Sequence, residues 1–251
     1  KTATNTTGTL FQNMSAMGGC AQGDTGDSVK TFIPLRFWFC ENPGLALPLI
    51  ALQYHEVKII LNGGSVTDGA ADCRLWADYI YLDTDERRRF AQVSHEYLIE
   101  QVQFQQIAAN ASEDLNFNHP VKELIWTGGW TGGINVALTA AQTYQLKLNG
   151  HDRFAARDRT YFTRTQVWEH HTGYGGLDET AGASRGNDSI AVYSFALKPQ
   201  EHQPSGTCNF SRIDTAQLVQ GTGAKQACNV YAVNYNVLRI MSGMGGLAYS
   251  N

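Results

Sequence analysis

The sequence predicts an all-β protein, a β-sandwich or barrel, and three observations lead to that class. Apolar and aromatic residues alternate with polar ones over many short runs, which is the pattern of strands with one buried face. The 251 residues include 25 glycines, 11 tyrosines and 11 phenylalanines, a composition typical of short strands joined by tight turns. No stretch longer than about a dozen residues has the pattern of a globular helix.

The first part of the chain is organised around Thr31–Leu61. Branched and aromatic residues predict a strand over Phe32–Phe39, and a period of two predicts a second strand over Gln53–Leu61. Asn42-Pro43-Gly44 predicts the corner between them, because proline restricts φ and glycine tolerates positive φ. The apolar run Leu45–Leu52 is too short to span a bilayer, and neither a signal peptide nor a transmembrane helix is visible.

The next segment predicts a strand followed by a short helix. Cys73–Asp83 has strand character, and Thr84–Phe90 begins with a helix-start signal. Thr84 is the expected N-cap, and Asp85 and Glu86 fall in the first turn, where the helix dipole favours carboxylates. The arginines that follow predict a solvated helix face that pairs with local carboxylates, in preference to a phosphate site.

The remainder of the chain predicts a complete sandwich, because seven alternating runs and an eighth over Ile134–Ala140 fit a jelly roll. In one run Tyr144 and Leu146 are expected to face inward while Lys147 faces outward. Asn149-Gly150, which ends that run, is a strong signal for a tight turn. The seven runs are Glu96–Phe104, Leu115–Trp126, Tyr144–Asn149, Thr160–Trp168, Ile190–Lys198, Cys208–Leu218 and Val230–Ile240.

Long strings of the chain match a known family in the family's own order. They are FWF-x-x-x-PGLALPLIALQYHEV, DYIYLDTDERRRFAQVSHEYLIEQVQF, LNFNHPVKELIW, LNGHDRF, YSFALKPQEHQPSGTCNFSRID and the tail NVYAVNYNVLRIMSGMGGLAYSN. On these strings, from about Phe32 to its last residue, the chain resembles the major capsid proteins of large icosahedral double-stranded DNA viruses of the chlorella-virus and iridovirus type.

The resemblance implies an all-β double jelly-roll β-sandwich in which the first roll is incomplete and the second is complete. Residues 1–92 would hold the C-terminal part of the first roll and a connector helix, and residues 93–251 the second roll. The family's early strands have no counterpart in the polar opening stretch 1–28. We therefore expect a fragment, a cleaved product or a chain whose N-terminal part was not included, with an exposed sheet edge.

The same resemblance implies a structural function without catalytic residues or cofactors. Three copies would form a pseudo-hexagonal capsomer, and neighbouring capsomers with minor capsid proteins would tile an icosahedral shell. Such a protein would be a late product, assembled in the cytoplasm of the infected cell and located in the virion.

The charge balance agrees with a shell protein better than with a nucleic-acid binder. The formal net charge is -4 and the pI is about 6.0, whereas nucleic-acid-binding proteins usually carry a basic face. We therefore expect neither direct nucleic-acid binding nor membrane insertion. Five widely spaced cysteines, none in a C-x-x-C pair, predict reduced and mostly buried thiols. They are Cys20, Cys40, Cys73, Cys208 and Cys228.

Few residues suggest chemistry. Glu169-His170-His171 is the most suggestive cluster. Adjacent strand residues point to opposite faces, so the two histidines are predicted to lie on a loop surface and to hold no metal. Asp152-Arg153 predicts an ion pair. Ser242–Gly246 is glycine-rich and predicts a flexible C-terminal turn.

The sequence carries N-x-S/T sequons at Asn5, Asn13, Asn110, Asn187 and Asn209. Family members in algal viruses are glycosylated on outward loops, sometimes outside this sequon. The candidate glycosylation sites are, in order, Asn187, Asn110 and Asn5, because each lies in a polar, loop-like tract. Asn209 lies in a strand-like run and is expected to be covered.

Two other classes of function fit a β-sandwich. A carbohydrate-binding jelly roll would use exposed aromatic residues such as Trp130, in the glycine-rich loop Thr127–Gly133. A sandwich enzyme would need a metal or a cluster of perturbed titratable groups. Neither accounts for a match that runs along the whole chain. In a capsid protein, Trp130 and Tyr174 would be candidates for loop packing between copies.

Overall fold

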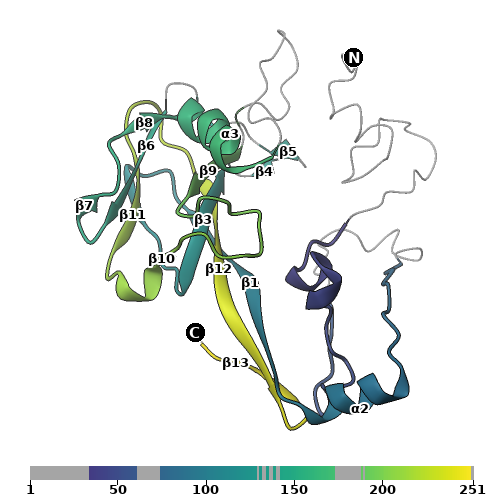
Figure 1. Ribbon diagram of the computed structural model, residues 1–251. Coiled ribbons are helices and arrows are strands. Elements are labelled where there is room, and N and C mark those ends of the chain that lie inside the picture. Colours follow the sequence, from purple (N-terminus) through teal and green to yellow (C-terminus); the bar gives the residue numbers. More distant parts are fainter. Residues whose placement is uncertain are drawn as a thin grey trace, which may run out of the picture. The chain divides into compact units, whose positions relative to one another are not determined.

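The computed structural model describes residues 34–60, 74–128, 130–131, 134–135, 138–139, 142–172, 188 and 190–249. These residues belong to two compact units. Unit 1 comprises Glu100–Tyr235 with residues 34–37, and unit 2 comprises Trp38–Ile99 with residues 236–249. Strands β1 (His95–Ile107) and β12 (Cys228–Met241) contribute residues to both units (Figure 1).

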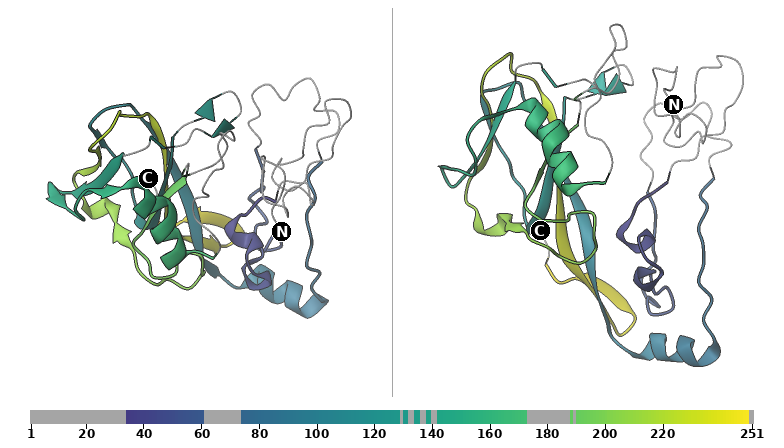
Figure 2. Two further views of the ribbon diagram at one scale, coloured as in Figure 1. Left: turned by 90° about the horizontal axis from the view of Figure 1, so that it is seen from above. Right: turned by 45° about the horizontal axis from the view of Figure 1, so that its top comes forward.

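Unit 1 is built on two antiparallel sheets (Figures 1 and 2). One sheet has the order β1-β12-β3-β10, with β9 also paired to β3, and the other has the order β2-β11-β6-β7, with β8 also paired to β6. When the two-residue strands are set aside, β1, β2, β3, β6, β9, β11 and β12 alternate between the two sheets, which is the winding of a jelly roll. The remaining strands are β2 (Ser112–Asp114), β3 (Pro120–Thr127), β4 (Trp130–Thr131), β5 (Ile134–Asn135), β6 (Thr143–Leu148), β7 (His151–Asp152), β8 (Arg157–Asp158), β9 (Ile190–Ser194), β10 (Cys208–Asn209) and β11 (Ala216–Gln220).

The core of unit 1 lies between the two sheets and is centred on three buried aromatic side chains, Trp126, Tyr144 and Phe162. The ring centroids of Trp126 and Phe162 are 5.1 Å apart, and those of Trp126 and Tyr144 are 5.3 Å apart in an edge-to-face arrangement. Leu146 and Leu218 pair across β6 and β11 and join the same core. The predicted inward side of this run, which includes Tyr144 and Leu146, is therefore confirmed.

The turn after β6 forms as predicted, with φ of 50° at Asn149 and 77° at Gly150. Two residues in the left-handed region make the tight hairpin that joins β6 to β7. The predicted ion pair between Asp152 and Arg153 is wrong. The carboxylate of Asp152 instead lies 3.8 Å from the ammonium group of Lys147, its neighbour across the hairpin.

The predicted strand over Thr160–Trp168 is wrong. The segment is a π-helical turn, η5 (Tyr161–Thr165), that continues directly into the α-helix α3 (Gln166–His170). Phe162 and Gln166 are buried, whereas Trp168 is 79% exposed. This spacing of four residues between buried positions belongs to a helix, and over so short a run the branched residues imitate a strand.

Several other strands are confirmed with different bounds. The run Cys208–Leu218 is divided into β10 and β11 by a 3-10 turn, η6 (Phe210–Arg212), and the strand in Ile190–Lys198 ends at Ser194. The run Leu115–Trp126 begins as an extended segment and joins the sheet as β3 only from Pro120.

The strands predicted for the first part of the chain, Phe32–Phe39, Gln53–Leu61 and Cys73–Asp83, are wrong wherever those residues are described. Residues 34–60 contain two 3-10 turns, η1 (Trp38–Cys40) and η2 (Pro43–Leu45), and residues 74–83 are irregular. A strand requires a hydrogen-bonded partner strand, which these residues do not have among the described parts of the chain. Ile60, Trp76 and Tyr81 are accordingly 78%, 80% and 92% exposed.

The corner at Asn42 is confirmed as a turn, because the Asn42 side chain caps η2 by accepting a hydrogen bond from Gly44 N at 2.8 Å. The predicted helix is also confirmed, as α2 (Thr84–Gln92). Its N-cap is Asp83 rather than Thr84, since the Asp83 carboxylate accepts a hydrogen bond from Glu86 N at 2.8 Å.

The predicted turn in the glycine-rich tail is confirmed at Ser242 and Gly243, and the residues after it continue as a strand. Met244–Leu247 form β13, which pairs with β12 around a turn at Ser242 and Gly243 with φ of 53° and 80°. A Cβ at Gly243 would lie 2.5 Å from the ring of Tyr54, whose backbone N donates to Gly243 O at 2.9 Å. The absence of a side chain at this position is thus what allows the hairpin to pack.

Replacement of Phe162 by alanine should reduce the free energy of unfolding by about 3–5 kcal/mol, because it removes a buried ring that contacts both sheets. Urea unfolding of the full chain, followed by tryptophan fluorescence, measures the change. Trp168→Ala is the matched control in the same helical segment, and there we expect a change within about 0.5 kcal/mol. Equal losses in both variants would contradict the proposed role of Phe162.

Candidate functional site

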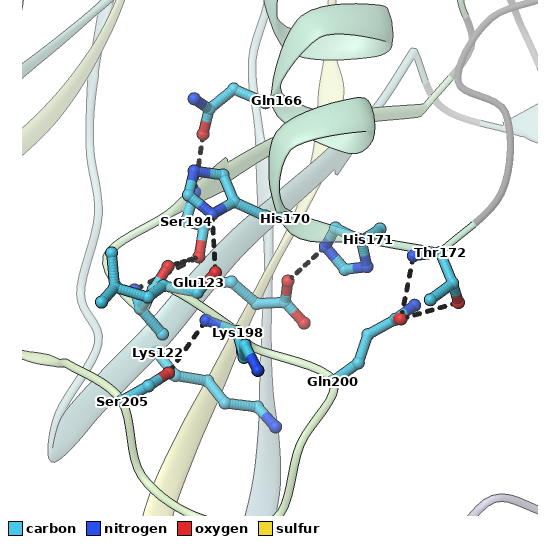
Figure 3. A network of polar contacts seen from close by, with 12 residues as sticks. Lys122, Glu123, Gln166, His170, His171, Thr172, Ser194, Lys198, Gln200 and Ser205 are labelled. Atoms are coloured by element: carbon cyan, nitrogen blue, oxygen red, sulfur yellow. Dashed lines mark hydrogen bonds and ion pairs between the residues drawn. The ribbon is translucent and has the colours of Figure 1, made fainter.

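The charged and polar groups of unit 1 gather around a bulge in β3. Val233 of β12 pairs with Glu123, and the next residue, Asn234, pairs with Val121, so Lys122 is the extra residue of the bulge. The carbonyl of Lys122 accepts hydrogen bonds from the two successive backbone amides that follow β9, at 2.9 and 3.2 Å. Because of the bulge, the side chains of Lys122 and Glu123 are both buried although the two residues are neighbours in the strand (Figure 3).

Each of these two charges has a partner. The Lys122 ammonium lies 2.5 Å from a carboxylate oxygen of Glu100 on β1 and 5.5 Å from the ring centre of Tyr235. Burial, reinforced by the charges of Glu100 and Glu123, raises the pKa of Tyr235 to about 12. The carboxylate of Glu123 lies 2.9 Å from Nε2 of His171. A buried charge is tolerated only with such a partner.

The two histidines at the end of α3 do not lie as predicted. His170 and His171 are both partly buried, and neither belongs to a strand or to an open loop surface. Nδ1 of His170 lies 3.0 Å from Leu197 O, while His171 contacts Glu123 as described above. Within the described parts of the chain, no group of three histidine, cysteine or acidic residues is arranged to hold a metal ion.

Further hydrogen bonds fasten α3 to β9 and to the loop that follows it. The backbone N of Ser194 donates to Oε1 of Gln166 at 3.1 Å. Nε2 of Gln166 donates to the hydroxyl of Tyr161 at 2.9 Å. Thr172 donates from both its backbone N and its hydroxyl to Oε1 of Gln200, at 2.9 and 2.8 Å. Figure 3 shows Gln166, Thr172 and Gln200 among the side chains that converge from the helix, the strands and the loop.

A second cluster surrounds Asp188, which is 3% exposed. Arg164 donates to both carboxylate oxygens, at 3.0 and 2.9 Å, and the hydroxyl of Thr163 donates to one of them at 2.6 Å. Arg159 lies 3.7 Å away. The hydrogen bonds from Arg164, with those from Thr163 and the nearby positive charges, hold the pKa of Asp188 below its usual value, against the effect of burial. The carboxylate of Asp188 is therefore held in place by Arg164 and Thr163.

The described cysteines, Cys40, Cys208 and Cys228, are free thiols. Cys228 is buried, and burial raises its pKa to about 11, so its thiol stays protonated. Cys208 is half-buried and Cys40 is exposed. Cys20 and Cys73 lie outside the described residues.

The structure describes two of the sequon asparagines. Asn110 is exposed, and its side-chain amide donates to the carboxylate of Glu113. Asn209 is also exposed, so the expectation that it is covered is wrong; its Oδ1 accepts a hydrogen bond from Ser211 N at 3.1 Å and caps η6. Asn5, Asn13 and Asn187 lie outside the described residues, as do the side chain of Trp130 and all of Tyr174.

Sequence reasoning missed the polar residues that organise unit 1, above all Lys122, Glu123 and Asp188. One signal was present, since Lys122-Glu123 interrupts the otherwise apolar run VKELIW. Adjacent charges inside a central strand require buried partners, and that requirement could have singled them out. The partners themselves lie far away in the sequence and carry no such signal.

The fold defines a jelly-roll β-sandwich protein, and polar side chains attach its helical segment and loops to the sheets. Among the described residues no helix is both long and apolar enough to cross a membrane. A family model described as "Large eukaryotic DNA virus major capsid protein" matches residues 86–129 and 132–246, and one described as "Major capsid protein N-terminus" matches residues 11–83. The chain belongs to the major capsid protein family of large eukaryotic DNA viruses.

Individual relatives agree with this assignment. The major capsid protein of Pyramimonas orientalis virus is 55% identical over 264 residues, which cover 96% of this chain and 67% of that protein. The major capsid protein of Paramecium bursaria Chlorella virus 1 is 39% identical, over 90% of this chain and 68% of that protein. The function is accordingly that of a structural, non-enzymatic component of a viral capsid.

Solved structures confirm the jelly-roll capsid fold. A crystal structure of PBCV-1 VP54, fitted into a reconstruction of the virophage Sputnik, is similar with a TM-score of 0.68 and 36% identity, over 88% of this chain and 70% of that one. A quasi-atomic model of the PBCV-1 virus capsid has a TM-score of 0.67 and 38% identity, with the same coverage of both chains.

Replacement of Asp188 by asparagine should lower the free energy of unfolding by about 3 kcal/mol at pH 7, because it removes the carboxylate partner of two arginines. The folded-state pKa of Asp188 is lowered. Its contribution is therefore complete above about pH 5 and is lost as the pH falls below about 4. The urea concentrations at the unfolding midpoint of the Asp188→Asn variant and of the unchanged chain should therefore converge as the pH falls.

The control for this experiment is Asp152→Asn, which alters an exposed ion pair with Lys147 and should change stability by less than about 0.5 kcal/mol. A difference between the Asp188 variant and the unchanged chain that stayed constant from pH 7 to pH 3 would refute the assignment.

Proposed function

We propose that this capsid protein assembles as a homotrimer that forms a pseudo-hexagonal capsomer, and that neighbouring capsomers and minor capsid proteins complete an icosahedral shell. The observation that carries the proposal is membership of the major capsid protein family along nearly the whole chain. Two sandwiches in each of three copies present six similar lateral faces. Repeated use of the same contacts by identical copies closes a shell.

The boundary between the two rolls falls near Gln92, where α2 ends, with residues 1–92 in the first roll and its connector helix and residues 93–251 in the second. The family models support this division, since one ends at residue 83 and the other begins at residue 86. The exposed Ile60, Trp76 and Tyr81 are of the kind that protein contacts cover, and contacts within the assembled capsomer would bury them.

Assembly takes place in the cytoplasm of the infected cell, without direct nucleic-acid binding and without membrane insertion. The formal charge of -4 supports the first of these exclusions, because a shell protein that gripped nucleic acid would carry a basic face.

The trimer is tested by native mass spectrometry of the purified chain, with electron microscopy of the same sample. We expect a species of three times the 27.6 kDa chain mass, or larger particles built from it, as the concentration rises into the micromolar range. A species that stays monomeric throughout this range and shows a single cooperative unfolding transition would refute self-assembly.

We also propose Asn110 as a glycan acceptor, with Asn187 and Asn5 as further candidates. Asn110 is exposed, and its side chain makes only a local contact with Glu113 among the contacts described for it. Peptide mapping by mass spectrometry of the protein from virions should show a glycan-bearing peptide that contains Asn110. The peptide with Asn209 serves as the comparison and should be unmodified, because that side chain caps η6. An Asn110 peptide without any added mass would remove this site.

A further inference from the structure

Strand β1 presents two glutamines, Gln103 and Gln105, on the face that also carries the core residue Ile107. Residues two apart in a strand point to the same side of the sheet. Both glutamines therefore point toward the interior side of the sandwich, at the margin where β1 ends its sheet. Polar side chains in such a position require partners that offer both donors and acceptors.

The partner is the margin of the opposite sheet. That sheet ends at β2, whose pairing with β11 continues through Leu115, because Leu115 N donates to Ala216 O at 2.7 Å. Backbone N–H and C=O groups of alternate residues in an antiparallel strand point to the same side. The backbone N–H of Leu115 points to β11. The backbone groups of Asp114, Asn116 and Asn118 therefore point away from β11, to the open margin of the sheet.

The two glutamines bind the backbone of all three of these residues. Oε1 of Gln105 accepts from Asn116 N at 2.8 Å, and its Nε2 donates to Asp114 O at 2.7 Å. Oε1 of Gln103 accepts from Asn118 N at 2.9 Å, and its Nε2 donates to Asn118 O at 2.6 Å. Four backbone groups on the margin of the sheet are thus satisfied by side chains.

The amide groups of Gln103 and Gln105 lie where the peptide groups of an additional strand would lie. A glutamine amide carries the same donor and acceptor as a peptide group. Two residues of a strand advance by about 6.8 Å, so amides at alternate positions of β1 repeat at the interval at which the neighbouring margin presents its free groups. The side chains of Gln103 and Gln105 therefore bind four of the six backbone groups that residues 114, 116 and 118 would offer to an added strand.

We propose that Gln103 and Gln105 form an amide clip that occupies the margin of residues 114–118 and prevents a strand of another copy of this chain from pairing there. Unpaired sheet margins are templates for strand addition. A protein whose copies are held side by side is exposed to this reaction at high local concentration. The clip is independent of the proposed trimer and of the glycan sites, because it rests on contacts within unit 1 alone.

The test compares the double variant Gln103→Leu/Gln105→Leu with Gln106→Leu, which alters an exposed glutamine of the same strand. Hydrogen exchange of the full chain, read by mass spectrometry with residue resolution, should be about ten-fold faster at the Asn116 and Asn118 amides in the double variant, the effect of one lost hydrogen bond of about 1.4 kcal/mol. Sedimentation velocity should show larger, concentration-dependent species, with an intermolecular β-sheet band in the infrared spectrum. The control should match the unchanged chain in both measurements.

Unchanged exchange at Asn116 and Asn118 would overturn the clip, and faster exchange without new association would overturn its role against strand addition. If the double variant does not fold, Gln105→Asn decides, because its amide is one methylene too short to reach the margin. We then expect faster exchange at Asn116 while Asn118 stays protected, together with the same infrared band. Equal exchange at both amides, or no band, would refute the proposal.

Discussion

The packing of Phe162 against Trp126 and Tyr144 is the interaction on which the rest of unit 1 depends. Phe162 does not belong to either sheet, and its burial draws the helical segment η5 and α3 against the sandwich. That placement brings Gln166 to the backbone of β9 and His171 to Glu123. The polar network around the β3 bulge therefore follows from an apolar contact, since hydrogen bonds to α3 form only where the helix has already docked.

The buried charges contribute geometry more than stability. An ion pair such as Lys122–Glu100, with the lysine side chain 3% exposed, must offset the cost of removing both charges from water. The ion pair instead specifies the pairing register of β3, because a register shift would leave Lys122 or Glu123 buried without a partner. The bulge, which is one residue long, thereby fixes how β3 lies against β12 and where the loop after β9 attaches.

What the sequence predicted well depended on local periodicity. β6 and β12 are regular enough for alternation to identify them, and α2 is marked by Asp85 and Glu86 in its first turn. The strand predicted over Thr160–Trp168 is wrong because nine residues offer too few helical turns to separate a period of two from one of 3.6. In Thr31–Leu61 the β propensity is real, but a strand exists only with its partner, and propensity says nothing of that partner.

Strand β1 shows why the remaining features could not be predicted. Alternation alone would place Val102 and Phe104 in the core and Gln103 and Gln105 in water, yet Val102 is 64% and Phe104 58% exposed. The strand is turned the other way: Ile107, on the same side as Gln103 and Gln105, enters the core, and the two glutamines supply partners for four backbone groups of residues 114–118. Phe104 consequently lies outside, with its ring centroid 5.1 Å from that of Tyr231. Satisfying a sheet margin thus creates an apolar outer surface, and in a capsid protein an apolar surface beside a closed margin favours contact through side chains over contact through backbone.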